Sequence, residues 1–378
     1  MGAGCVWLPF NIEINRWGKS LIASAFLDLR KEMTCMGRKT QMNSLTTPEL
    51  LEQVNPENKE LLQEFLDYLR STQRSEGTIR GYENDIQIAF VWNLQSNGNL
   101  PFVEWKKRQI VKYQNWLLNE NKNSPARVKR LKASLSSFAN YIQNILDEDY
   151  PNFRNIIRKI EDPVNSPVRE KTVLSAEELQ ELLDKLIEKK KYKQACFLAL
   201  AMYSGRRKSE LCRFRMSDFS PERLVCDGAL YKSSPIKTKG RGGGKMLECY
   251  TLAKKFQPYL NMWIEERQRV EIKSDWLFPK SDNAEEHIEI STANSYSKTF
   301  SNILGKEVYL HSLRHYFVSE LSRQGLPDNA IVLLVGWSDS SGGAMCSLYN
   351  DNPKDDQLEM WFSGGDIDTS KKKDFKDL

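Results

Sequence analysis

Apolar residues recur in steps of three and four through four consecutive stretches between residues 58 and 146. This spacing places them on one face of a helix, so each stretch predicts an amphipathic helix. Asn97, Gly98 and Pro101 break the pattern after the second stretch. Ser124 and Pro125 are typical of an N-cap and a first helical position. The pattern therefore predicts a four-helix domain, with helices near residues 59–69, 78–94, 108–119 and 125–145.

A second domain is expected to begin at residue 172. Residues 162–171 contain two prolines and mixed charge without periodicity, which is typical of a linker. Ser175 and Glu178 form a capping-box pattern that opens a helix to about residue 190. Residues 193–202 are almost wholly apolar, so the helix they predict is expected to lie in the core.

Short β-branched runs follow Asp218 and predict a β-hairpin from residues 231–239 and 245–252 around a glycine-rich tip. The tip lacks GK[ST] and no helix start follows it, which argues against a nucleotide site. Lys239 on such a hairpin is either an exposed lysine or, beside a phosphate, a proton donor to a leaving oxygen. Together these elements predict a mainly α protein with a small β-sheet.

Two basic side chains three residues apart, His311 and Arg314, open the stretch from Tyr309 to Tyr349. One helical turn would place both on the same face. A guanidinium presents a planar fork that suits two oxygens of a phosphate. Tyr349 is then either a core residue or a nucleophile that attacks the bound group.

Another basic motif, Ser204 to Leu211, follows the apolar helix. An arginine at the mouth of a buried helix is costly unless it binds something. Glu210 lies three residues after Arg207 and could orient it.

Basic residues are also concentrated towards the end of the first domain, where no acid occurs between Asn121 and Leu146. They form either a solvated face or a surface that follows DNA phosphates. The candidate DNA-binding residues are Lys106, Lys107, Arg108, Lys122, Arg127, Lys129, Arg130 and Lys132.

Composition bears on three classes of function: nucleic-acid binding, metal binding and membrane insertion. The net charge is only +5, so the position of the basic residues is more informative than their sum. The seven cysteines lack a CxxC pair and there are three histidines, which argues against a zinc site. No apolar run approaches the ~18 residues of a membrane span. We therefore expect a cytoplasmic protein without metal or cofactor.

The motifs SGRRKSEL, IKTKG, HSLRH, VGW and SLY, in this order, resemble those of the tyrosine recombinase (phage integrase, Xer-like) family. The resemblance covers about residues 58–362. It implies a helical, SAM-like core-binding domain followed by a mixed α+β catalytic domain. The residues that match the catalytic set of the family are Arg207, Lys239, His311, Arg314, Trp337 and Tyr349, with Glu210 as a supporting acid.

The resemblance also implies a mechanism. Tyr349 would attack a DNA phosphate and form a 3′-phosphotyrosyl link, while the two arginines hold the non-bridging oxygens. His311 would act as general base or oxygen donor, and Lys239 as general acid. Because the link conserves the phosphodiester energy, neither ATP nor a metal is implied.

Two features depart from the family. Trp337 stands where most members have histidine; its indole N–H can donate to a phosphate oxygen but cannot exchange protons near neutral pH. The gap between Trp337 and Tyr349 is longer than usual, and residues 340–343 are the expected insertion. Cys346 lies at the usual spacing but is rejected as nucleophile, because a phenol carries the chemistry of the family.

The expected organisation is an N-terminal extension (1–57), a helical core-binding domain (58–161), a linker (162–171), a catalytic domain (172–362) and a polar tail (363–378). Residues 1–57 are interpreted as an N-terminal extension: an accessory or mobile segment, an early start, or a separate DNA-binding arm. Leu358, Trp361 and Phe362 share helical spacing. They would pack on their own domain or, as the family implies, on a neighbour in a homotetramer on paired DNA sites; residues 363–378 form a polar, disordered tail.

Within this family, a recombinase of a mobile element is the favoured function, acting on double-stranded DNA. The alternatives are a housekeeping recombinase, a topoisomerase-like relaxing enzyme and a binding-only regulator on the same scaffold. Recombinant products would indicate a recombinase, and relaxation of DNA without recombination would indicate a topoisomerase-like enzyme. A dispensable Tyr349 would indicate a binding-only regulator.

Overall fold

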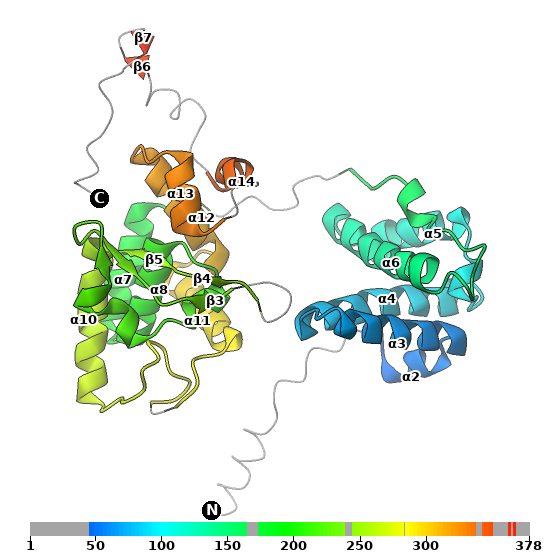
Figure 1. Ribbon diagram of the computed structural model, residues 1–378, viewed down its shortest axis with the longest axis horizontal. Coiled ribbons are helices and arrows are strands. Elements are labelled where there is room, and N and C mark those ends of the chain that lie inside the picture. The colour runs from blue at the N-terminus through cyan, green and yellow to red at the C-terminus, as the bar shows by residue number, and fades with distance from the viewer. Residues whose placement is uncertain are drawn as a thin grey trace, which may run out of the picture. The chain divides into compact units, whose positions relative to one another are not determined.

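The computed structural model describes residues 45–164, 173–238, 244–282, 284–337 and 342–350, and the backbone of 362–363 and 366–367. The chain folds into two compact units (Figure 1). Helices α2 to α6 lie in the first, and the elements from α7 onward lie in the second. Residues 1–44, the hairpin tip with Lys239, and Leu358 and Trp361 lie outside the described part of the chain. None of the described helices is long and apolar enough to cross a membrane.

The four helices predicted for the first unit are all present, and a short helix precedes them. The third predicted helix continues into a π-helical turn, η2 (Trp116–Glu120). The unit consists of α2 (Pro48–Gln53), α3 (Pro56–Ser71), α4 (Glu76–Ser96), α5 (Lys107–Asn115) and α6 (Pro125–Ile145), with the 3₁₀ turns η1 (Phe102–Glu104) and η3 (Ile157–Lys159).

Local signals explain where these helices begin. The Ser124 hydroxyl accepts a hydrogen bond from Arg127 N at 3.3 Å, and Pro125 occupies the first helical position. The apolar stripes meet in one core around Phe65, Phe90 and Phe138, which are almost fully buried. Burial of these stripes, rather than intrinsic helix propensity, stabilises the unit.

The second unit is built around α8 (Tyr192–Ser204), whose apolar surface is covered on all sides. It contacts α7, α10 and α12. The expected capping box is present in α7, where Ser175 and Glu178 bond each other's backbone N–H. The other helices are α7 (Ala176–Glu188), α9 (Lys208–Leu211), α10 (Ala253–Arg269), α11 (Ile290–Leu304), α12 (Leu310–Arg323), α13 (Asp328–Val335) and α14 (Gly342–Tyr349), with the 3₁₀ turns η4 (Met216–Phe219) and η5 (Pro221–Arg223).

The predicted hairpin is present as two antiparallel pairings. A three-stranded sheet has the order β1-β2-β5, from β1 (Leu224–Val225), β2 (Leu230–Lys232) and β5 (Tyr250–Leu252). Beyond it, β3 (Ile236–Lys237) pairs with β4 (Met246–Leu247). Thr238 extends this pairing, since its N–H and its hydroxyl both donate to Lys245 O. The fold is therefore mainly α with small sheets, as predicted.

The C-terminal segment differs from expectation at one described point. Phe362 lies in β6 (Phe362–Ser363), which pairs antiparallel with β7 (Asp366–Ile367). Phe362 therefore does not continue a helix with Leu358 and Trp361, and residues 363, 366 and 367 are ordered in a strand pair. Helical spacing alone misled here, because a run this short is compatible with either structure.

Candidate active site

The chain turns sharply after α8 and delivers two arginines to one end of this helix. Gly205 caps α8 in the left-handed region at φ +57°, and a Cβ there would lie 2.2 Å from Phe317 Cδ1. Arg207 then caps α9, and its N–H donates to Glu210 Oε2 at 3.1 Å. Its Nη1 also pairs with Glu210 Oε1 at 3.1 Å, and Glu210 is fully buried. Glu210 thus fixes both backbone and side chain of Arg207, the orienting role that the sequence suggested.

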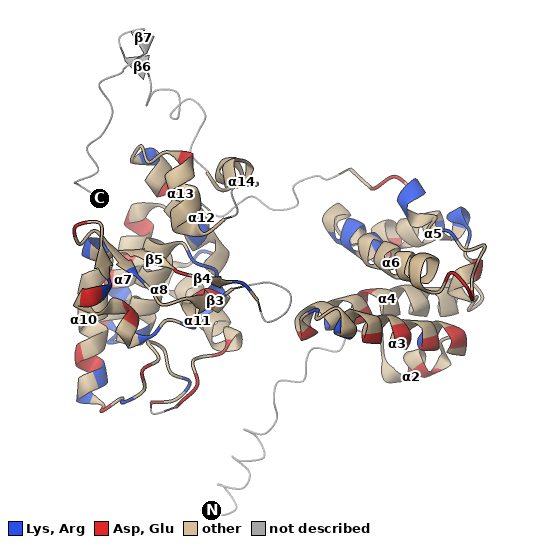
Figure 2. Ribbon diagram, in the orientation of Figure 1, with Lys and Arg blue, Asp and Glu red and all other residues tan. Residues whose placement is uncertain are grey.

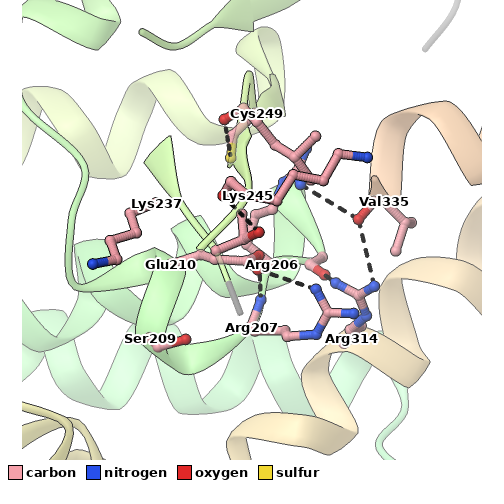
Figure 3. A network of polar contacts seen from close by, with 12 residues as sticks. Arg206, Arg207, Ser209, Glu210, Lys237, Lys245, Cys249, Arg314 and Val335 are labelled. Atoms are coloured by element: carbon pink, nitrogen blue, oxygen red, sulfur yellow. Dashed lines mark hydrogen bonds and ion pairs between the residues drawn. The ribbon is translucent and has the colours of Figure 1, made fainter. Parts of the chain in front are cut away.

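Arg314 lies on α12, which contacts α8. It is only 1% exposed, and its Nη1 donates to Gly205 O at 2.9 Å. Its Nη2 donates to the carbonyl oxygen of Val335, the last residue of α13, at 3.4 Å. Burial is the main cause that lowers the pKa of Arg314 to about 10, so the guanidinium stays charged at neutral pH. Figure 3 shows Arg207 and Arg314 side by side.

Tyr349, at the end of α14, hydrogen-bonds to His311 at the start of α12. The distance between Tyr349 Oη and His311 Nε2 is 3.0 Å. Both side chains belong to the same chain, although they lie 38 residues apart. A neutral imidazole nitrogen that lacks a proton accepts from the phenol, which is the geometry required of a general base.

Three other side chains surround the Tyr349 ring, which is 8% exposed. His315 stacks on it at 4.3 Å with an interplanar angle of 17°. The Trp337 ring meets it edge-on at 5.0 Å, and the Arg314 guanidinium lies 5.8 Å from its centre. His315 was not among the predicted site residues. Its position four after His311 on the same helix face was the available signal.

The charge state of His311 follows from its surroundings. Partial burial, followed by the positive charges of His315, Arg314, Arg207 and Lys208, lowers the pKa of His311 below its ordinary value near 6.5. The imidazole is consequently neutral at pH 7 and free to accept a proton from Tyr349.

Trp337 contributes an indole N–H donor to the site. The indole Nε1 is buried, and no acceptor for it occurs among the described residues. The Arg314 guanidinium lies 5.0 Å from the Trp337 ring. Since a buried N–H without an acceptor is costly, the arrangement suits an anion bound beside Arg314.

Two lysines flank the hairpin tip among the described residues, Lys237 and Lys245, and both are exposed. Lys239, the predicted proton donor, lies outside the described residues. Lys237 is exposed, and its ammonium points away from Arg207 and Arg314 in Figure 3.

Cys346 precedes Tyr349 by one helical turn but is unsuited to nucleophilic attack. It is 2% exposed, and burial raises the pKa of its thiol to about 11. Of the expected insertion at residues 340–343, Gly342 and Gly343 form the start of α14. That helix packs against α13 and carries Tyr349 to His311.

The predicted basic surface of the first unit is present only in part. Figure 2 shows lysine and arginine along α5 and α6. Lys132, however, is 3% exposed and its ammonium is held by Ile160 O, Glu161 O and Asp162. Lys132 therefore fastens the segment after α6 and does not present its charge to solvent.

The arginines of α6 are also engaged with their own domain. Asp85, buried in α4, pairs with Arg127 at 2.7 Å and with Arg130 at 3.3 Å. Arg130 nevertheless remains 63% exposed, and Lys129 58%. Exposed charges also remain at Lys106, Lys107, Arg108 and Lys122.

A pocket of about 390 Å³ adjoins the site at Arg207 and His311 and is also lined by Arg206, Lys208 and Tyr309, among others. The Arg314 guanidinium, the Trp337 indole and the Tyr349 phenol bonded to His311 lie close together. Such a centre can bind a tetrahedral oxyanion and attack it with the tyrosine oxygen. No cluster of three metal-ligating side chains occurs among the described residues.

Comparison with known proteins agrees with both units. A model described as the phage integrase family matches residues 172–354, and one for a phage integrase N-terminal SAM-like domain matches residues 61–151. A recombinase-like protein, YomM, of the SPbeta prophage in Bacillus subtilis (strain 168) is 29% identical over 70% of this chain and 78% of its own length. A tyrosine recombinase of Thermosipho africanus (strain TCF52B) is 25% identical over 79% of this chain and 98% of its own.

Among solved structures, the XerH site-specific recombinase bound to palindromic difH substrate matches with a TM-score of 0.57. The match covers 84% of this chain and 96% of the XerH chain, and the two sequences are 16% identical. At this identity the match establishes a shared fold.

Proposed function

Because this chain belongs to the phage integrase family of tyrosine recombinases, we propose that it breaks and rejoins DNA with Tyr349 as the nucleophile. The observation that carries the proposal is the 3.0 Å hydrogen bond between Tyr349 Oη and His311 Nε2, formed beside Arg314 in one chain. It supports cleavage in cis, by the tyrosine of the protomer that binds the phosphate.

In the first step, the Tyr349 oxygen bonds to the scissile phosphorus and its proton passes to His311 Nε2. The bond from phosphorus to the 5′ oxygen breaks, and Lys239 protonates the leaving 5′ oxygen. Arg207 and Arg314 stabilise the charge on the non-bridging oxygens, and the Trp337 indole N–H donates to one of them. A 5′-hydroxyl of another strand then attacks the phosphotyrosine in the reverse sense, which makes the reaction recombination.

The overall function can be tested with a plasmid that carries two copies of a duplex enriched from a random pool by binding to this protein. We expect two recombinant circles. Relaxation of supercoils without recombinants would indicate a topoisomerase-like enzyme instead. We propose that the chain serves a mobile element, which the prophage origin of one relative supports. Its site should then occur at both ends of an integrated segment and not once per chromosome.

Cleavage should decline on acidification. His311 must be neutral to accept the proton, and its folded pKa lies below 6.5. The single-turnover cleavage rate should be constant between about pH 7.5 and 8. It should fall on acidification with a midpoint below 6.5, by about tenfold per pH unit once the pH lies below the pKa of His311. The His311→Gln variant should be slower and should lack this acid limb. A wild-type midpoint above 6.5 would contradict the assigned base.

The proton donor can be identified with a substrate whose 5′-bridging oxygen is replaced by sulfur, which leaves without a proton. Lys239→Ala should cleave ordinary DNA about 10²-fold more slowly and should recover on the sulfur substrate. Lys237→Ala is the matched control because its ammonium points away from the arginines. If the sulfur substrate restored cleavage by Lys237→Ala and not by Lys239→Ala, Lys237 would be the proton donor.

The exposed lysines and arginines of α5 and α6 are proposed to contact DNA phosphates. Lys107→Ala with Arg108→Ala should weaken binding to all sequences and reduce the slope of log K against log salt by about 2. Lys132→Met should leave the slope unchanged and lower the melting temperature, because Ile160 O and Glu161 O lose their donor. An unchanged slope in the double variant would exclude these two residues.

We further propose a homotetramer on paired sites. The masses of complexes with one and with two DNA sites, from analytical ultracentrifugation, test this assembly. Deletion of residues 356–378 should preserve single-site binding and prevent tetramer formation. If the deletion variant still formed a tetramer, residues 356–378 would not be the segment that docks on a neighbouring protomer.

A further inference from the structure

The arginine before Arg207 is buried although the mechanism gives it no function. Arg206 is 1% exposed, and among the described residues no carboxylate forms an ion pair with it. Burial of an unpaired cation is unfavourable unless strong hydrogen bonds offset it. The contacts of Arg206 therefore indicate what the charge does.

The guanidinium of Arg206 binds three backbone carbonyls from two distant segments. Its Nη2 donates to Leu334 O at 3.0 Å and to Glu248 O at 3.2 Å, and its Nη1 to Val335 O at 3.4 Å. Leu334 and Val335 end α13, where carbonyls lack helical partners and the helix dipole favours a cation. Glu248 connects the two strands β4 and β5 of the hairpin.

One of these carbonyls is shared with the phosphate-binding arginine. Val335 O accepts from Arg206 Nη1 and from Arg314 Nη2, both at 3.4 Å, as Figure 3 shows. The next residue, Gly336, has φ +70°, and a Cβ there would lie 2.7 Å from Arg206 Nη1. Trp337 follows immediately. The position of Arg206 is therefore mechanically linked to Arg314, to Trp337 and to the hairpin that carries Lys239.

Building on the proposed function, we propose that Arg206 is a positioning residue for strand cleavage. It joins the end of α13 to the hairpin at Glu248, so that Arg314 and Trp337 meet the same phosphate. The planar fork is required for all three contacts, because Nη2 serves Leu334 O and Glu248 O while Nη1 reaches Val335 O, and a single ammonium replaces only one of these two nitrogens. A displacement of about 1 Å among such groups reduces a rate by about 10²-fold.

Arg206→Lys tests this role while it keeps the charge. The matched control is Arg267→Lys, since Arg267 is also buried and donates to the backbone carbonyls of Trp276 and Leu277 in the same unit. Both variants should melt at a lower temperature than wild type and bind DNA within about threefold. At saturating DNA and below both melting temperatures, Arg206→Lys should cleave about 10²-fold more slowly, and Arg267→Lys within about threefold of wild type.

A pair of glycine variants probes the same contact if Arg206→Lys does not fold. Gly336→Ala and Gly305→Ala impose the same strain, because both glycines cap a helix at φ near +70°. Only Gly336→Ala presses on Arg206, whereas a Cβ at Gly305 meets nothing within 4 Å. Gly336→Ala should cleave at least about tenfold more slowly than Gly305→Ala.

The outcomes separate this inference from the proposed function. Wild-type protein that forms no covalent DNA adduct would overturn the proposed function itself. If wild type cleaves and Arg206→Lys matches Arg267→Lys, or Gly336→Ala matches Gly305→Ala, Arg206 serves stability alone and the positioning role is wrong.

Discussion

Tyr349→Phe is expected to abolish strand cleavage while DNA binding stays within several-fold of wild type. The substitution removes only the phenol oxygen, and the ring keeps its packing against His315 and Trp337. Loss of the nucleophile of a covalent catalyst costs on the order of 10⁶-fold in rate, which places the product below detection. Binding is spread over many phosphate contacts and does not depend on this oxygen.

Two measurements check this result: the cleavage rate on a nicked duplex and the affinity for the intact duplex. Tyr316→Phe is the control, since Tyr316 is also partly buried and lies on α12. It should cleave at the wild-type rate. Residual cleavage by Tyr349→Phe would mean that another side chain attacks the phosphate.

Arg207→Ala and Arg314→Ala should each reduce cleavage about 10²- to 10³-fold, as expected for loss of one donor to a developing oxyanion. Both should also lower stability, for different reasons. Arg207 is 38% exposed, but its removal leaves the fully buried Glu210 carboxylate without its ion-pair partner. Arg314 is buried, and its removal leaves Gly205 O and Val335 O without these donors, which costs about 1–3 kcal/mol.

Single-turnover rates at saturating DNA, together with thermal melting, separate the two effects. Arg314→Lys would restore the charge but not the bidentate geometry, so it should regain stability only in part and remain slow. If either alanine variant cleaved at nearly the wild-type rate, the assignment of that arginine would be wrong.

The parts of the fold that could be predicted from the sequence depend on local interactions. The Ser124 cap and the Ser175–Glu178 capping box act within one turn of helix, so their signatures are visible in a few residues. The apolar stripes of the first unit likewise fix which helix faces are buried. These features explain why the first unit was predicted helix by helix.

The features that were missed depend on contacts between distant segments. Lys132 resembled its exposed neighbours, yet its partners lie 28 to 30 residues away and bury it. Arg206 is bound by carbonyls as far as 129 residues away. His315 stacks on Tyr349 only because α14 returns to α12. No local pattern encodes these approaches, whereas the predicted catalytic set rests on a motif order that resembles a family.

The central claim is that Tyr349 forms the covalent link to DNA. It is tested most directly with a duplex nicked next to the crossover point, on which the cleaved strand diffuses away and the link accumulates. Protease digestion and mass spectrometry of the adduct then identify the attached residue. We expect a 3′-phosphate bonded to the peptide that contains Tyr349. An adduct on any other residue, or none with protein that binds the duplex, would contradict the mechanism.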